Sequence, residues 1–282
     1  MDGLFHKGVV PASAGGGFGF QSRIWGLLLD RVVSEAVVVY NGTAVTVSAD
    51  ENPDLFWEMR VAGASLGVLT SFVFTAEPSP PQDLTFTYNW DFTASEASRA
   101  LAAFQDFVQI DIPATLGGEL VINKSPTSGN LAVQCFCIYF DDVATSNQTV
   151  APFMDLFREP DSASVTEGDW ITVCAEWATD ALDTTTLDLP LYNTSYVKSI
   201  LVPEEEVLST SAMNAFIEYL ATAGHDPDPG WRTVFLSTSL RIGLTGRQEV
   251  YYGKHYEKLT ELKSTYESGD VFHVPHSVKL KA

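Results

Sequence analysis

Residues 51–74, ENPDLFWEMRVAGASLGVLTSFVF, decide the fold of the N-terminal part of this chain. Asn52 is a residue type that favours the N-cap of a helix, and Pro53 suits the first helical position. The small residues at 62–65 then end the helix, and residues 67–75 are rich in β-branched and aromatic side chains. The stretch predicts a helix, a turn of small residues and a strand.

A second local pattern precedes this stretch. Residues 35–40 and 43–48 are both rich in β-branched side chains, and Asn41-Gly42 joins them. Asn-Gly is the pair that best supplies the two positive φ angles of a type I′ turn, so the segment predicts a two-residue β-hairpin. The N-x-T sequon at Asn41 is weakened by this prediction, because a glycan there would sit on the tight turn.

The residues 78–81, PSPP, mark a domain boundary, because consecutive prolines disfavour both helix and sheet. After it, residues 85–90 predict a short strand, and Thr93 with Glu96 forms a capping box that opens a helix to about Gln109. One face of that helix is apolar, with Ala97, Leu101, Phe104 and Val108.

The rest of the chain predicts a mixture of helices and antiparallel strands. Residues 116–123 and 130–139 form a second hairpin across the turn 127–129. The remaining predicted elements are helices at 152–157, 204–222 and 248–266, a strand at 231–240 and a closing strand at 271–275. The order of these elements is typical of an α+β fold with an antiparallel sheet.

The last predicted helix is amphipathic. Its apolar stripe consists of Tyr252, Tyr256, Leu259 and Leu262. Its expected solvent face carries Lys254, Glu257, Lys258, Glu261 and Lys263.

Composition argues against nucleic-acid-binding and membrane-spanning classes of protein. The net charge is −20, with 16 basic against 36 acidic residues among 282, which disfavours nucleic acid and anionic membranes as partners. No apolar run approaches the roughly 20 residues that span a bilayer, and the first residues lack the apolar core of a signal peptide. The further sequons at Asn123, Asn147 and Asn193 are weak indications of secretion.

The three cysteines predict buried thiols and not a metal site or a disulfide. Cys135 and Cys137 alternate with Phe136, so they would point to the same face of a strand, where neighbours are poorly placed to bond. Neither they nor Cys174 show zinc-ligand spacing. The histidines His6, His225, His273 and His276 are interpreted as structural or solvated.

Residues 14–20, AGGGFGF, allow two interpretations. Glycine permits positive φ and close backbone approach, so the cluster is either a tight structural crossing or a cradle for a phosphate-bearing ligand. It lacks both the dinucleotide-binding spacing and the lysine of a P-loop.

Three segments together resemble the FAD-linked oxidases that contain berberine bridge enzyme and the fungal oligosaccharide oxidases, a vanillyl-alcohol-oxidase-like group. They are residues 15–33, residues 51–72, and residues 251–259 with 271–277. A weaker match covers residues 196–199. The order and spacing agree from end to end of the chain.

The resemblance implies the C-terminal part of a two-domain PCMH-type FAD-binding fold, with an incomplete FAD domain. Residues 1–78 would form that partial domain, 79–240 a substrate domain with a helix-covered antiparallel sheet, and 241–282 a return to the FAD domain. The cofactor implied is FAD. The residues implied to lie along it are Gly16, Gly17, Gly63, Gly67, Val68 and His255.

The chain departs from the family pattern at its reactive positions. Val10 stands where some relatives attach the flavin through cysteine, and the family's flavin-attaching histidine would precede this chain, so no covalent link is expected. Thr238 and Ser239 occupy the positions of the family's Asn-Tyr pair, so no catalytic base is assigned. His255 replaces an asparagine that commonly contacts the flavin; it can still donate a hydrogen bond, or it is a helix-surface imidazole. Val61 replaces a usual glycine.

Two functions follow from this pattern. The first is an oxidoreductase that passes a hydride from an alcohol, sugar or secondary metabolite to FAD, with oxygen as the acceptor. The alternative is a catalytically inactive remnant or binding protein that does not retain FAD and exposes an open sheet edge. A small molecule is the expected partner, extracellular location is implied by the family, and oligomeric state is not predicted.

Overall fold

The computed structural model describes residues 16–17, 19–80, 82–127, 129–141, 143–177, 207–222, 234–237, 252–273 and 277–281. The chain divides into two compact units, which are treated separately below. Unit 1 comprises residues 1–78 and 242–282, and unit 2 comprises residues 79–241.

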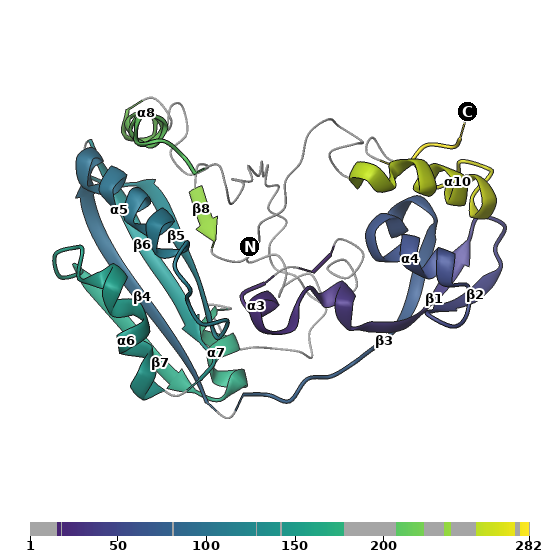
Figure 1. The fold of residues 1–282 in the computed structure, drawn as a ribbon, viewed down its shortest axis with the longest axis horizontal. Coiled ribbons are helices and arrows are strands. Elements are labelled where there is room, and N and C mark those ends of the chain that lie inside the picture. The colour runs from purple at the N-terminus through teal and green to yellow at the C-terminus, as the bar shows by residue number, and fades with distance from the viewer. Residues whose placement is uncertain are drawn as a thin grey trace. The chain divides into compact units, whose positions relative to one another are not determined.

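Unit 1 is a small helix-covered sheet. Its strands are β1 (Val32–Val39), β2 (Ala44–Ser48) and β3 (Gly67–Phe74), ordered β2-β1-β3 and all antiparallel. Its helical elements are α3 (Ser22–Trp25), η1 (Leu28–Arg31), α4 (Pro53–Ala62), η2 (Gly63–Ser65), η4 (Gly253–His255) and α10 (Tyr256–Tyr266). Helix α4 packs on the sheet and α10 packs on α4 (Figure 1), so the core lies between α4 and the strands.

The β1–β2 hairpin is confirmed, but the predicted turn type is wrong. The Val39 N–H donates to the Thr43 carbonyl at 3.0 Å, and the Gly42 N–H donates to the Val39 carbonyl at 2.9 Å. Gly42 has φ 82°, whereas Asn41 is not among the residues of positive φ and its side chain accepts from the Thr43 N–H at 2.9 Å. The loop is therefore a type I turn followed by a left-handed glycine, because Asn41 uses its amide oxygen to stabilise the ordinary conformation.

The start of α4 shows a similar difference. Pro53 occupies the first helical position as predicted, but Asn52 adopts a left-handed φ of 49° and makes no side-chain cap. Its side-chain nitrogen instead donates to the Thr46 carbonyl at 2.8 Å. Asn52 therefore fastens α4 to β2 and does not cap the helix.

Unit 2 is built around a five-stranded antiparallel sheet (Figure 1). The strands are β4 (Asp83–Thr93), β5 (Leu116–Lys124), β6 (Asn130–Tyr139), β7 (Ser162–Gly168) and β8 (Val234–Ser237), in the order β7-β4-β6-β5-β8. The helices are α5 (Ala94–Phe107), α6 (Val143–Met154), α7 (Trp170–Trp177) and α8 (Thr210–Ala221). Helices α5, α6 and α8 build the core with one face of the sheet, whereas α7 packs at the β7–β4 edge.

The core of unit 2 follows the alternation of its strands. Side chains such as Phe92, Leu120 and Val133 point toward α5 and are buried with its apolar stripe. The predicted capping box is confirmed: the Glu96 N–H donates to Thr93 Oγ1 at 3.3 Å, and the Thr93 N–H donates to Glu96 Oε2 at 2.9 Å. The hairpin β5–β6 is also confirmed.

Several boundaries differ from the sequence predictions. The helix predicted at 152–157 runs from Val143 to Met154. The helix predicted at 204–222 begins at Thr210, because Ser209 caps it by accepting from the Ala212 N–H at 3.2 Å. Strand β7 and helix α7 were not predicted, and residues 271–273 form no strand.

The prediction for the thiols of β6 is confirmed. Cys135 and Cys137 are free and buried, with their sulfur atoms 3.7 Å apart on the helix-covered face. The hydrogen bond from Cys135 and burial hold the pKa of Cys137 well above its ordinary value, so this thiol stays protonated. The side chain of Cys174 lies outside the described part of the chain.

Candidate functional site

The Gly63–Val68 segment joins α4 to the edge of the unit 1 sheet. Residues Gly63–Ser65 form η2, and β3 begins at Gly67. A Cβ at Gly67 would lie 2.6 Å from Val37 Cγ1 and 2.8 Å from the Val38 carbonyl oxygen, so close packing on β1 requires glycine there. Among the described strands β3 pairs only with β1, so its other edge keeps backbone N–H and C=O groups available from Val68 onward.

The predicted Gly16-Gly17 pair lies against the turn that leads into β1. Gly16 and Gly17 have φ of 101° and 69°. The Leu28 N–H donates to the Gly17 carbonyl at 2.9 Å, and the Leu29 N–H donates to the Gly16 carbonyl at 3.2 Å. Both carbonyl groups are therefore hydrogen-bonded within the protein. The positive φ angles, which glycine adopts readily, let the chain pass close to residues 28–29.

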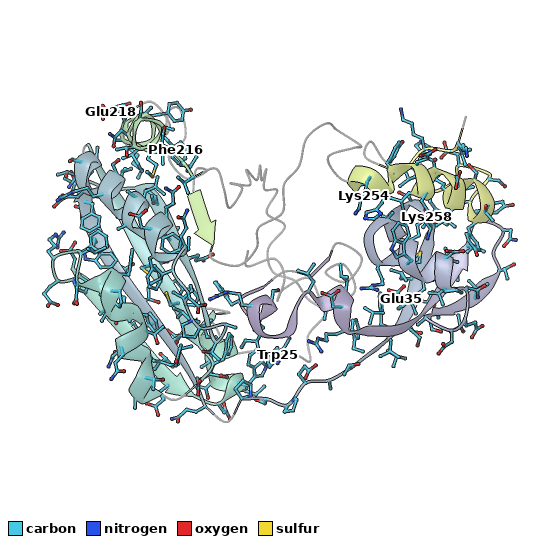
Figure 2. All side chains as sticks on the ribbon, in the orientation of Figure 1. Trp25, Glu35, Phe216, Glu218, Lys254 and Lys258 are labelled. Atoms are coloured by element: carbon cyan, nitrogen blue, oxygen red, sulfur yellow. The ribbon has the colours of Figure 1, made fainter. Side chains whose placement is uncertain are left out.

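His255 ends η4 and is exposed. Its ring meets the Trp57 ring edge-on, with centroids 5.4 Å apart. Lys258 Nζ lies 4.5 Å from the same Trp57 ring and 3.3 Å from Asp54 Oδ1. Figure 2 shows Lys254 and Lys258 on η4 and α10 beside α4, where Asp54 pairs with Lys258 and Glu257 is its neighbour in sequence, so this corner of unit 1 carries charges of both signs.

All six predicted cofactor residues lie in unit 1, and each of their segments reaches α4. Gly63 follows α4 directly, and His255 packs on Trp57 of that helix. The turn that holds Gly16 and Gly17 reaches α4 through an ion pair between Asp30 Oδ1 and Arg60, at 3.1 Å. Helix α4 is therefore the common support of the predicted site.

The sequence reasoning missed the burial of four acids, Glu35, Glu58, Asp83 and Glu267, of which the first two lie on the sheet and on α4 of unit 1. Burial raises the pKa of Glu35 to about 7, although Arg60 lowers it in part. Burial raises the pKa of Glu58 to about 8, against the lowering effects of Lys263 and Lys258. Burial therefore shifts both carboxyl groups toward the neutral form, and Glu58 more than Glu35. The one sequence signal for Glu58 was its place between Trp57 and Met59 in an apolar run.

Lys263 was predicted on the solvent face of the last helix, and this is wrong. Its side chain is fully buried, because the helix packs on α4 with a wider face than the tyrosine–leucine stripe indicated. Its ammonium group donates to the Phe272 carbonyl at 2.9 Å and lies 3.2 Å from Glu267 Oε2 and 3.1 Å from Asp270 Oδ1. The buried charge is thus fully surrounded by acceptors.

The sheet of unit 2 has a second face, opposite the helix-covered core. A polar row crosses it: Gln134 Nε2 donates to Asn89 Oδ1 at 2.9 Å, and Asn89 Nδ2 donates to Ser162 Oγ at 3.2 Å. In the next row Phe136 lies between Thr87 and Glu119 in the strand register. Amides and hydroxyls beside an aromatic ring suit a ligand that carries hydroxyl groups.

Several predicted positions lie outside the described residues: Val10, Thr238, Ser239, residues 196–199, His6, His225 and His276. His273 is exposed, with Nδ1 3.2 Å from the Asp270 carbonyl oxygen. Within the described ranges no group of acidic, histidine or cysteine side chains could hold a metal ion. None of the helices described is both long and apolar enough to cross a membrane.

The chain is similar in sequence to known flavoproteins. A family model described as "Berberine and berberine like" matches residues 229–279. An FAD-linked oxidoreductase of Metarhizium anisopliae is 30% identical over 216 residues, which are 76% of this chain and 40% of that protein. This chain is a homologue of the berberine-bridge-type FAD-linked oxidases.

Further relatives support the homology of this chain with the berberine-bridge-type FAD-linked oxidases. A xylooligosaccharide oxidase of Thermothelomyces thermophilus is 30% identical over 198 residues, 69% of this chain and 38% of that protein. The solved structure of a chitooligosaccharide oxidase superposes with a TM-score of 0.77 and 20% identity, covering 96% of this chain and 71% of that one. The predicted α+β, PCMH-type fold is confirmed. The chain spans about two fifths of the length of the curated relatives it matches.

Proposed function

We propose that this chain forms part of an FAD-dependent oxidoreductase. The observation that carries the proposal is the glycine turn at Gly63–Ser65, which leads into β3, whose second edge has no partner among the described strands, in a chain related to FAD-linked oxidases. Small residues let backbone amides approach anionic oxygens, and the exposed side chain of Val68 offers an apolar edge to a flat ring.

The residues present fit FAD in three places. Gly16 and Gly17 would lie along the cofactor, and the Gly63–Val68 turn would face its pyrophosphate and adenine. His255 would donate a hydrogen bond to the flavin ring, since its imidazole is exposed and supported by Trp57.

Bound FAD would supply the acceptor for a hydride from the substrate, with oxygen as the proposed final acceptor. The polar row Gln134–Asn89–Ser162 would bind and orient substrate hydroxyls. This arrangement favours a polyhydroxylated substrate, in line with the oligosaccharide oxidases among the relatives. Extracellular location is part of the same proposal.

A second candidate function is a binding protein that does not retain FAD. The sheet of unit 1 favours it, because β3 has an open edge and the side chains of Val33, Val68 and Val73 are about half exposed. Such an edge can pair with a strand of another chain instead of a cofactor.

Addition of FAD to the purified chain separates the two candidates. If FAD binds, protein and visible flavin absorption co-elute on gel filtration, and a peroxide assay with oligosaccharides and simple alcohols then tests the substrate. Acid precipitation should release the flavin, because no covalent attachment is expected. A colourless protein after incubation with FAD would refute the first proposal and favour the second.

A further inference from the structure

An ion pair links the two glycine segments of unit 1. Arg60 Nη2 lies 3.1 Å from Asp30 Oδ1, and the two residues are 30 positions apart in the sequence. Arg60 belongs to the last turn of α4, and Asp30 belongs to η1. The contact therefore joins two elements that the chain connects only through the β1–β2 hairpin.

Asp30 organises the turn on its own side of this contact. Its second carboxylate oxygen accepts from the Leu27 N–H at 2.9 Å. The next two residues, Leu28 and Leu29, donate their N–H groups to the carbonyls of Gly17 and Gly16. The position of Asp30 therefore determines where the Gly16-Gly17 segment is held.

Arg60 also lies close in sequence to the second glycine segment, Gly63–Val68. It precedes Gly63 by three residues, and its guanidinium lies 5.7 Å from the centre of the Phe56 ring on the same helix. Arg60 also interacts electrostatically with the buried Glu35, but its ion pair is with Asp30.

We propose that Arg60 is a positioning residue of the FAD site, which acts through Asp30 to hold the Gly16-Gly17 segment in register with the Gly63–Val68 turn. The inference rests on the proposed function, since it assigns both segments to one cofactor. Arg60 itself need not touch the ligand.

The first test needs no cofactor. Arg60→Gln, Asp30→Asn and the double variant are compared with the wild type by amide hydrogen exchange at Leu28 and Leu29. Asn at position 30 keeps an oxygen for the Leu27 N–H and removes the charge. Each single variant should exchange about fivefold faster at both amides, and the second substitution should add little. Unchanged exchange would overturn the proposal.

The second test measures FAD affinity by flavin fluorescence. Arg60→Gln should weaken binding by about fivefold, and Arg60→Lys, which keeps the charge, should lose less. The control is Glu261→Gln, which breaks the exposed ion pair of α10 with Lys281 and should leave both readouts unchanged.

The two tests separate the two proposals. If the wild type binds no FAD, the proposed function fails and the positioning role fails with it, even where exchange at Leu28 and Leu29 responds as expected. If the wild type binds FAD and Arg60→Gln accelerates exchange without weakening binding, the ion pair is structural only. That outcome would overturn the inference and leave the proposed function intact.

Discussion

The two units of this protein are stabilised by different means. Unit 2 has a large apolar core between α5 and its sheet, built from side chains such as Phe92, Leu101 and Ile122. The cluster between α4 and the sheet of unit 1 is small, and unit 1 also buries Glu35, Glu58, Lys263 and Glu267. A buried charge or unpaired carboxyl costs stability. In unit 1 Lys263 is paired with Glu267 and Asp270, whereas neither carboxylate oxygen of Glu58 has a hydrogen-bond partner among the described residues.

The largest expected effect comes from Lys263. Lys263→Met keeps the volume but leaves Glu267 buried without its partner, which should lower the free energy of unfolding of unit 1 by about 3–5 kcal/mol. The measurement is urea denaturation followed by tryptophan fluorescence. Lys254→Met, at an exposed position, is the control and should change little. A loss as small as that of the control would show that the buried charges contribute nothing.

The apolar core of unit 2 should respond almost as strongly. Leu101→Ala removes a buried side chain from α5 and should cost about 2–5 kcal/mol. The matched control is Ile110→Ala, whose side chain is 52% exposed. Hydrogen exchange should show the loss in the strands of unit 2 and not in β1–β3. A loss spread equally over both units would contradict their description as separate cores.

A dependence of stability on pH should distinguish unit 1 further. The pKa of Glu58 is about 8 in the folded chain against 4.5 for an ordinary glutamate, so the folded state holds its proton over this interval. The contribution of Glu58 to stability is therefore largest at low pH and should fall by about 2 kcal/mol from about pH 5 to about pH 7. Glu58→Gln should flatten this fall. A profile that rises with pH, or one unaffected by the substitution, would show that Glu58 is ionised in the folded state.

The smallest effect is local to unit 2. Thr93→Ala removes the capping box of α5 and should cost about 1 kcal/mol, measured by urea denaturation. Ser95→Ala, at an exposed position one residue into the helix, should be close to neutral. Equal effects of the two would mean that the cap does not stabilise α5.

Local patterns predicted local structure well. The capping box at Thr93 and the strands on either side of residues 125–129 were found because their signals lie within a few residues of each other. The start of α6 at Val143 was missed although two aspartates, a residue type that favours the N-cap, precede it in the sequence. Strand β7 is too polar and exposed to show a buried strand pattern.

The candidate site likewise has features that the sequence could predict and features that it could not. Glycine-rich turns are visible in sequence, so Gly16, Gly17, Gly63 and Gly67 could be proposed without coordinates. The Asp30–Arg60 contact and the burial of Lys263 could not be proposed, because both depend on where α4 packs against η1 and α10. The period of apolar residues shows which side of a helix is buried, but it does not show how far the buried surface extends around the helix, and Lys263 lies within that extension.

The central claim is that the Gly63–Val68 turn binds FAD, and two matched valines test it most directly. Val68 and Val73 lie on β3 and are 52% and 53% exposed, so aspartate at either position should cost similar stability. Titration of the chain with FAD should show saturable one-to-one binding that Val68→Asp weakens at least tenfold, by repulsion of the phosphates, and Val73→Asp leaves nearly unchanged. Absence of binding, or equal weakening by the two substitutions, would contradict the account.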